Sequence, residues 1–383
     1  MIFLVEKRLL RQKVWFQGEF SEEDTRDLVK MFDFLARQPV PTEFEAWCKR
    51  IGWNLSGHGR PYPDCGKTLY RGCENVRAHP QGKVFGRIFR RTCMRKQCPV
   101  CYESWALAEA ERSLIRFVSY FYGYPYVERL ILKVKTETWK AQRRVFHKRL
   151  QTKLELLLHR RRQERIIHWV ISPPQYIDIR ALGYAKARTE AYLHARNVGF
   201  KGGCMVFHPF RLRCRKCKSR IDDYSKICLS CGSRRFEWYP SPHWHAVGLG
   251  WISHEGVGVQ YKRSGWVVRN LGVRKNVFWT MGYLLSHAGV FEDPNPCKIL
   301  SRKRKFHVTT WFGILAYSKL SVPKIGSFPE RCPYCQHFLK PLDYVGLDRP
   351  PPEYDVEDPL KNEFLADRHL WSVHHAEKRV DLC

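Results

Sequence analysis

The chain has 383 residues, and its 67 Lys and Arg residues against 37 Asp and Glu residues give a formal net charge of +30. This length excludes a single small module and allows two or three domains of roughly 150 residues each. The basic excess favours a polyanionic partner, and nucleic acid is the first candidate.

The sequence does not predict a membrane protein or a secreted protein. It contains no apolar run of about 18 residues, and residues 1–5 are too short for the apolar core of a signal peptide. Many of its 15 cysteines occur in C-x2-C pairs, which in a long chain indicates metal binding in a reducing compartment more than disulfides. We therefore expect a cytoplasmic, zinc-binding protein that does not bind membranes.

Hydrophobic periodicity, charge runs and cysteine spacing divide the chain into five predicted regions. They are a helical segment at 1–55, a zinc-knuckle module at 56–116, a basic helical region at 117–163, a domain of strands and helices at 164–320 with a zinc ribbon inserted at 211–236, and a C-terminal region at 321–383 with a C-x2-C pair and an acidic, Pro-rich tail.

Three apolar, β-prone segments predict strands within the fourth region. They lie at 166–172, 203–210 and 243–252, with a predicted helix at 179–197 and a further strand at 306–314. Strands interrupted by helices and by long irregular excursions favour an α+β layer structure over a regular βαβ repeat.

The strongest zinc signal is a pair of C-x2-C knuckles ten residues apart. Two such knuckles on a short hairpin can place four thiolates at tetrahedral corners, with no open coordination position for catalysis. We expect a structural zinc there, held by Cys214, Cys217, Cys228 and Cys231.

Two further knuckles are less complete. Cys98 and Cys101, with Cys93 close before them, predict a second site. Its fourth ligand is predicted to be Cys73, with Cys65 as the alternative.

Cys332 and Cys335 form a third knuckle without a second pair at ribbon distance. His337, His307 or Cys297 could complete it, and a turn without metal is an equal alternative.

The chemistry-bearing segment is the β-prone stretch around His243 and His245. Residues i and i+2 of a strand point to the same face, so the two imidazoles converge as metal ligands would. H-x-H alone is a weak signal, because paired strand histidines are often structural.

A predicted helix at 276–289, closed by Gly289, follows about forty residues later. Its apolar side carries the leucines, whereas Tyr283 and His287 fall on the polar side, where a core tyrosine is not expected. A phenol has a pKa near 10, so Tyr283 needs a nearby cation to become a nucleophile. His287, one turn later, could assist proton transfer or orient the ring.

These segments, in order, resemble the three motifs of HUH endonucleases: the apolar strand at 166–174, His243-Trp-His245, and helical Tyr283. The knuckle at 93–101 followed by Tyr-Glu-Ser-Trp-Ala resembles archaeal plasmid-type rolling-circle replication initiators. The resemblance spans residues 65–335, and the histidine and tyrosine segments carry most of it. Relatives often show Tyr-x-x-Lys-Tyr, whereas this chain has Tyr283-Leu-Leu-Ser-His287, which implies a single-tyrosine mechanism.

The resemblance implies an HUH-type antiparallel sheet with flanking helices and with the zinc modules inserted, and it implies roles for residues. His243 and His245 would bind a catalytic Mg²⁺ or Mn²⁺, with His208 as the third ligand and His168 as the runner-up. Tyr283 would join a 5′ phosphate, and the freed 3′ hydroxyl would prime rolling-circle replication of a plasmid or virus. Single-stranded or hairpin-origin DNA would be the substrate, and a host helicase is a possible partner.

Two function classes follow. The first is a DNA-nicking and joining enzyme, whether a replication initiator, a relaxase or a single-strand transposase, with Tyr261 or Tyr317 as the next nucleophiles to test. The second is a non-catalytic zinc-ribbon DNA-binding regulator. Zinc would be structural in both.

Overall fold

In the computed structural model of the chain, the described residues are 52–59, 61, 63–138, 143–161, 165–174, 182–221, 227–252, 254–291, 307–326, 331–347, 350–354 and 362–373. The predicted N-terminal helical region at 1–55 therefore lies almost wholly outside the described residues.

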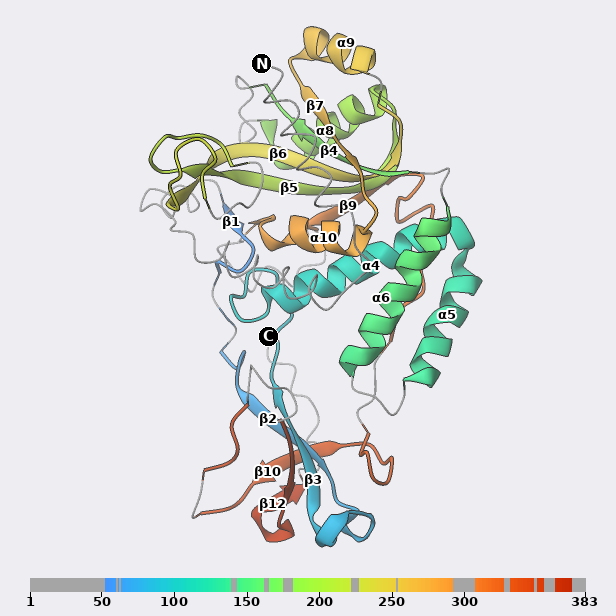
Figure 1. Cartoon of the computed structure of the whole chain (residues 1–383), viewed down its shortest axis with the longest axis vertical. Helices are drawn as coiled ribbons and strands as arrows, with labels where there is room; N and C mark the ends of the chain where they lie inside the picture. Colours follow the sequence, from blue (N-terminus) through green and yellow to red (C-terminus); the bar gives the residue numbers. More distant parts are fainter. Residues whose placement is uncertain are drawn as a thin grey trace.

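A five-stranded antiparallel sheet, here called the main sheet, lies in the upper part of the molecule as drawn in Figure 1. Its strand order is β7-β4-β6-β5-β9, and every neighbouring pair is antiparallel. The strands are β4 (Ile166–Ser172), β5 (Phe200–Cys214), β6 (Phe236–Gly250), β7 (Val267–Val273) and β9 (Thr309–Gly313).

Alternation along the strands gives this sheet two buried faces. On β4, Trp169 and its alternate neighbours enter one core with Trp244 and Phe200, whereas Ile166 enters the other. The first core is covered by α8 (Tyr184–Asn197) and α9 (His254–Ser264). The second is covered by α10 (Val277–Ser286), then by α4 (Tyr102–Tyr122), with α5 (Tyr124–Glu137) and α6 (Arg143–Arg160) packed against α4.

Strands β5 and β6 are each 15 residues long, about twice as long as the other strands of the sheet. Strand β4 pairs with β6 only at 244–249, so the segments 210–214 and 236–240 pair only with each other. They form a two-stranded arm that carries the cysteine-rich ribbon away from the sheet (Figure 1).

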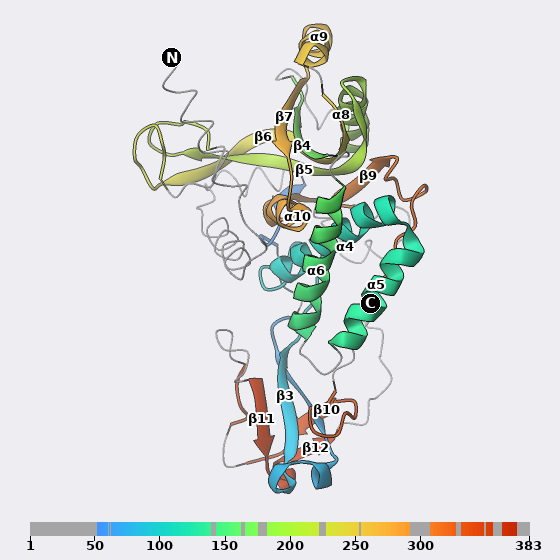
Figure 2. The ribbon, with the colours of Figure 1, turned by 45° about the vertical axis from the view of Figure 1, so that its right-hand side comes forward.

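A second five-stranded antiparallel sheet, here called the second sheet, lies at the other end of the molecule (Figures 1 and 2). Its order is β11-β3-β2-β10-β12. The strands are β2 (Thr68–Cys73), β3 (Val84–Arg90), β10 (Lys340–Tyr344), β11 (Glu363–Ala366) and β12 (Trp371–Val373), with short 3-10 turns η1 (Val76–Ala78), η2 (Pro80–Gly82) and η5 (Arg368–Leu370). A separate two-stranded pair joins β1 (Trp53–Leu55) to β8 (Gly289–Phe291).

The α+β class with antiparallel sheets is confirmed. Strand β4 has the predicted bounds, and β5 and β6 extend beyond theirs into the arm. The predicted regions 56–116 and 321–383 are not separate, because their strands pair within the second sheet. The predicted glycine C-cap is also wrong: α10 ends at Ser286, and Gly289 begins β8. Among the described helices, none combines the length and the apolar character needed to cross a bilayer.

Candidate active site and metal centres

Three histidines meet on the face of the main sheet that α10 covers. His208 on β5 lies directly opposite His243 on β6 in the strand register, and His245 follows two residues later on the same face. One ring nitrogen of each lies within 4.8 Å of the others. The structure thus brings His208, the expected third ligand, to the pair, because antiparallel register places cross-strand partners side by side.

His168, the runner-up, lies behind His245 as a hydrogen-bond partner. Its Nε2 is 2.7 Å from His245 Nδ1, and its Nδ1 is 3.2 and 3.0 Å from Nε and Nη2 of Arg274. A guanidinium only donates, so His168 Nδ1 accepts and His168 Nε2–H donates to His245. The proton of a neutral His245 then lies on Nε2, 3.1 Å from His243 Nε2.

His243 is oriented by its other ring nitrogen. Its Nδ1 lies 2.7 Å from the Ser241 carbonyl and 3.2 Å from Arg211 Nε. The shorter contact places the Nδ1 proton on the carbonyl side, which leaves the Nε2 lone pair directed at His245. This is the arrangement by which a second group fixes the tautomer of a metal-binding histidine.

The histidine group is buried. No member is more than 8% exposed, and burial holds the pKa of His208, His243 and His245 well below the usual value. The imidazoles are therefore neutral at physiological pH, which is the state that coordinates metals. Neither ring nitrogen of His208 makes a well-aligned hydrogen bond among the described residues, although the Leu284 backbone lies close to the ring. A buried imidazole with so few partners fits a metal ligand.

Tyr283 reaches this group through one imidazole. The rings of His287 and His208 have centroids 4.2 Å apart, and the rings of Tyr283 and His287 are 5.2 Å apart. Tyr283 also stacks on Trp279, with nearly parallel rings 6.0 Å apart. It is half-buried, whereas its neighbour Leu284 is fully buried. Burial lowers the pKa of His287 to about 3, so this imidazole is neutral and a weak proton acceptor.

The start of α10 is fixed by two acceptors. Asn276 Oδ1 accepts from Trp279 N at 2.7 Å, as an N-cap does. Glu155 Oε1, from α6, accepts from Phe278 N at 2.9 Å. Burial raises the pKa of Glu155 to about 8, against hydrogen bonds from two backbone N–H groups that lower it. The helix that carries Tyr283 is thus held at its N-terminus by a buried carboxyl group.

The ribbon cysteines come together as the spacing predicted. Cys214 and Cys231 have sulfurs 3.5 Å apart, as do Cys217 and Cys228, and all four form one group. The residue after each knuckle, Lys218 or Gly232, has a positive φ and donates its N–H to the carbonyl of the first cysteine. This compact turn directs both thiols to one point, and the group is compatible with structural zinc.

The second cysteine group differs from the prediction in one member. Cys65, not Cys73, joins Cys93, Cys98 and Cys101, and Cys65 Sγ lies 3.0 Å from Cys101 Sγ and 3.5 Å from Cys98 Sγ. Cys73 was the predicted fourth ligand and Cys65 the alternative. The correction has a topological reason: β2 carries Cys73 to the far end of the second sheet, whereas Cys65 lies before β2 beside the knuckle.

Cys73 belongs to a third group instead. It lies with His79 and the knuckle cysteines Cys332 and Cys335. The residues considered for completing that knuckle are not in the group. His337 is exposed, and its Nδ1 contacts Cys335 Sγ alone among the sulfurs of the group. His307 is exposed and is not part of any such group among the described residues, and Cys297 lies outside the described residues.

The alternative nucleophiles lie away from the histidines. Tyr261 is 55% exposed on α9, on the opposite face of the main sheet. Tyr317 is 55% exposed and packs on Arg116, whose guanidinium is 4.6 Å from the ring centroid. Tyr283 is therefore the one of the three nucleophile candidates that is linked to the three histidines, through the ring of His287.

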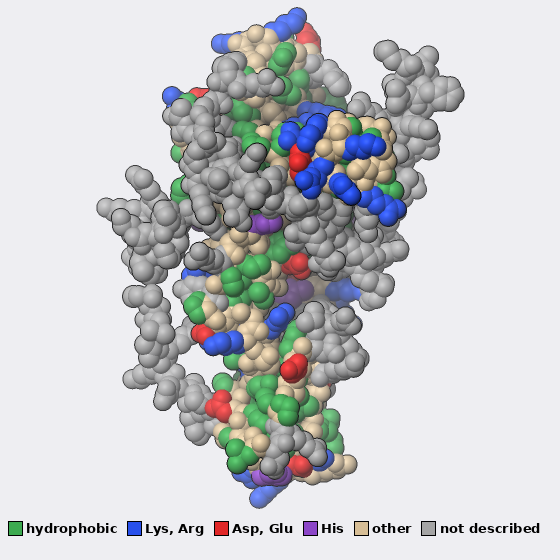
Figure 3. Space-filling view, turned by 90° about the vertical axis from the view of Figure 1, so that its left-hand side faces the viewer, with side chains coloured by type: hydrophobic (Ala, Val, Ile, Leu, Met, Phe, Trp, Pro, Cys, Tyr) green, Lys and Arg blue, Asp and Glu red, His purple; other side chains and the backbone are tan. Residues whose placement is uncertain are grey.

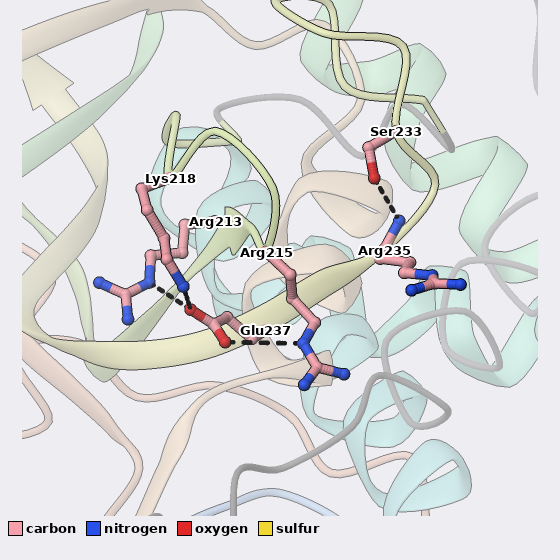
Figure 4. A network of polar contacts seen from close by, with 6 residues as sticks. All are labelled: Arg213, Arg215, Lys218, Ser233, Arg235 and Glu237. Carbon is pink, nitrogen blue, oxygen red and sulfur yellow. Dashed lines mark hydrogen bonds and ion pairs between the residues drawn. The ribbon is translucent and has the colours of Figure 1, made fainter.

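The ribbon is also the most basic part of the surface in Figure 3, where blue side chains gather on the lobe facing the viewer. Between residues 213 and 237 the described residues include seven cations and one carboxylate, Glu237. Glu237 accepts from Arg213 at 2.7 Å and from Lys218 at 2.9 Å, and Arg215 lies 3.8 Å away (Figure 4). The cations are Arg213, Arg215, Lys216, Lys218, Arg220, Arg234 and Arg235.

Sequence reasoning missed two members of these sites, Arg274 and His79, and gave a third, Cys65, only as an alternative. Arg274 carries no motif, and its role depends on the position of β7 beside β4. His79 is a single histidine far from any knuckle, and Cys65 was weighed but ranked second. Only the odd number of cysteines near residue 98 indicated that one of them served elsewhere.

No family model matches this chain, and no curated protein or solved structure shows significant similarity to it.

Proposed function

We propose that the protein nicks and rejoins single-stranded DNA through Tyr283, as an HUH-type enzyme with a divalent cation held by His208, His243 and His245. The supporting observation is that three neutral imidazoles converge on one face of the main sheet and that Tyr283 meets them through His287. Rolling-circle initiation is the favoured biological role, and a relaxase or single-strand transposase would use the same site.

The reaction is a transesterification. The phenol oxygen of Tyr283 attacks the phosphorus, a 5′-phosphotyrosyl bond forms, and the P–O bond to the 3′ oxygen breaks, which releases a 3′ hydroxyl after protonation. The neutral ring of His287 lies next to the phenol ring and would orient it. Because the pKa of His287 is lowered to about 3, the phenol proton would pass to water, and the leaving oxygen would take a proton from water. A bound cation would draw charge from the phosphate oxygens and favour phenolate. Rejoining is the same step in reverse.

The donor set bears on the identity of the cation. Three imidazoles without a carboxylate would by ligand type also accept Zn²⁺, Ni²⁺ or Cu²⁺, so Mg²⁺ or Mn²⁺ is proposed from the HUH resemblance, and of these two Mg²⁺ has the stronger preference for oxygen ligands. We therefore propose Mn²⁺ as the better activator of this site. Because Tyr283 is more exposed than the histidines, the DNA backbone would approach the array from the tyrosine side.

The basic ribbon supplies the affinity for DNA in this proposal. Arg215 and Arg235 are exposed, and the shared carboxylate of Glu237 neutralises only one of the surrounding charges. Phosphate contacts from such cations are independent of sequence and sensitive to salt. The arm formed by β5 and β6 connects this surface directly to the strands that carry His208 and His243.

The test compares Tyr283→Phe with Tyr261→Phe in nicking of supercoiled plasmid with Mn²⁺. Tyr283→Phe should lower the nicking rate by at least about 10³-fold and abolish the covalent DNA adduct, because the nucleophile is gone. Tyr261→Phe, on the opposite face, should leave both unchanged. Recovery of a phosphotyrosyl peptide containing residue 283 would support the assignment, and an active Tyr283→Phe protein would refute it.

The burial of the histidines favours a second candidate, a zinc-ribbon DNA-binding regulator without catalysis. With no member more than 8% exposed, a metal bound there would be structural. In that case the wild-type protein binds DNA through the ribbon but neither nicks nor forms an adduct with any divalent cation.

A further inference from the structure

A mixed cysteine and histidine group joins the two ends of the described chain. Cys73 Sγ lies 3.3 Å from Cys335 Sγ, and His79 Nε2 lies 3.2 Å from Cys332 Sγ and 3.8 Å from Cys335 Sγ. Tetrahedral bonds of about 2.3 Å from zinc to sulfur put two sulfurs about 3.8 Å apart. The four atoms thus have nearly the spacing of a zinc site with three thiolates and one imidazole.

The knuckle at 332–335 has the backbone of a metal-binding turn. Gln336 has a φ of 63°, and its N–H donates to the Cys332 carbonyl at 3.0 Å. Lys218 makes the same turn after the first ribbon knuckle, with a φ of 57° and the same 3.0 Å bond to Cys214. A left-handed conformation is costly for a residue with a side chain. Its occurrence in both knuckles indicates that both turns serve the same purpose.

His79 is presented to this group in one tautomer. Its Nδ1 lies 2.8 Å from the Lys83 carbonyl, which can only accept, so the ring proton is on Nδ1 and the lone pair of Nε2 faces the sulfurs. The histidine is 6% exposed, and Cys73 and Cys332 are 3% and 0% exposed. Three of the four side chains are therefore buried with their ligand atoms directed at one point.

Among the described residues, few apolar side chains are buried at this end of the second sheet. The buried members of the cluster around the group are Phe85 and Leu339 beside Cys73 and Cys332, and Tyr334 packs on His79 and Phe85. A core this small does not offset the entropy of ordering the segments that form it. The two pairs of ligands are also more than 250 residues apart in sequence, so a shared ion would close a very long loop.

We propose that Cys73, His79, Cys332 and Cys335 bind one structural Zn²⁺ that joins the β2–β3 hairpin to the C-terminal segment. The ion substitutes for the missing core and holds β10 in register against β2. This site does not depend on the nicking activity, and it stands or falls separately from the tyrosine site.

The first test counts zinc in the purified full-length protein. Cys332→Ser combined with Cys335→Ser, and separately His79→Ala, should each lower bound zinc by one equivalent per chain. The matched control is His337→Ala, which removes the imidazole beside Cys335 from the same knuckle and should leave the zinc content unchanged. Loss of zinc in His337→Ala but not in His79→Ala would overturn the ligand set.

A second measurement covers the case in which a variant folds poorly. His79→Cys keeps four ligands and should retain the zinc that His79→Ala loses. In the cobalt-substituted proteins, His79→Cys should also add intensity to the thiolate-to-cobalt absorption. A spectrum that does not differ between wild type and His79→Cys would show that residue 79 is not a ligand.

Hydrogen exchange locates the effect. In His79→Ala, amides of β2, β3 and β10 should exchange at least about tenfold faster, while those of β4, β5 and β6 keep their protection. Unchanged exchange in β10 despite loss of one zinc would refute the structural role proposed for the ion.

Discussion

The main sheet and the second sheet differ in what holds them together. Trp169, Trp244 and Phe200 are fully buried on one face of the main sheet, and helices cover both of its faces. The second sheet has a few buried side chains in two small clusters, one of which contains Cys73 and Cys332. Apolar burial is therefore extensive in the main sheet and much smaller in the second sheet.

This contrast separates two uses of metal ligands. In the main sheet the histidines occupy a scaffold that packing has already fixed, so an ion bound there is free to serve chemistry. In the second sheet the thiolates lie where the apolar core is small, so an ion bound there would serve folding. Ligand type follows the same division: imidazoles in the first case and mainly thiolates in the second.

Chelation should separate the two uses most strongly. Brief EDTA treatment removes a cation held by three imidazoles faster than zinc held by four ligands, three or four of them thiolates. Nicking should then fall by at least about 10³-fold and return with Mn²⁺, while hydrogen exchange in β2 and β10 does not change. Nicking that survives complete removal of all metals would contradict both the site and the contrast.

The free energy of unfolding should change with pH because of Glu155, the buried carboxyl group that holds the N-terminus of α10. The pKa of its carboxyl is raised from 4.5 to about 8 by burial, so folding takes up a proton between these pH values and stability falls as the pH rises from about 4.5 to about 8. A shift of this size corresponds to about 5 kcal/mol at most. Glu155→Gln, which keeps the acceptor for Phe278 N–H, should match wild type near pH 5 and be more stable near pH 8.

Denaturant unfolding of both proteins at each pH gives this difference directly. Comparison with the variant is needed because the buried histidines act in the opposite sense: their lowered pKa values stabilise the fold at neutral pH, and this contribution is lost as the pH falls below about 6.5. Equal pH profiles for wild type and Glu155→Gln would mean that the carboxyl is charged in the folded protein.

Arg274 sets the proton positions in the histidine site through His168. His245 Nε2 carries a proton in the metal-free site, so this nitrogen can bind a metal only if the proton moves to His245 Nδ1 and the hydrogen bond to His168 Nε2 changes direction. His168 would then carry its proton on Nδ1, facing the N–H groups of Arg274, so Arg274 opposes metal binding. Arg274→Ala removes that opposition, so Mn²⁺ affinity measured by calorimetry should rise by about tenfold, the equivalent of one hydrogen bond to a charged group. Arg269→Ala, exposed on β7, is the control and should have no effect. Weaker binding by Arg274→Ala would overturn the proton placement.

The smallest expected effect concerns the ribbon surface. Arg215→Ala combined with Arg235→Ala should weaken binding of single-stranded DNA a few-fold and lower the salt slope of log K by about 1.4, about 0.7 for each lost phosphate contact. Fluorescence anisotropy at several salt concentrations measures the slope. Lys262→Ala with Arg263→Ala on α9, on the far face, should leave it unchanged, and an equal change there would indicate diffuse electrostatic binding.

The sequence by itself determined the local features, because short-range rules govern them. An apolar, β-prone run predicted β4 at its observed bounds, C-x2-C spacing predicted the ribbon, and two residues of separation placed His243 and His245 on one face. Each of these depends on neighbours in the chain, where backbone geometry leaves few choices.

Only the tertiary structure decided which distant residues meet. Cys65 displaced Cys73 because β2 separates them in space, and Cys73 found partners more than 250 residues away. Arg274 reached His168 because β7 pairs with β4, and Tyr283 reached the histidines because α10 packs against the main sheet. Such contacts depend on strand order and helix packing, which arise from burial summed over the whole chain and leave no local signal in the sequence.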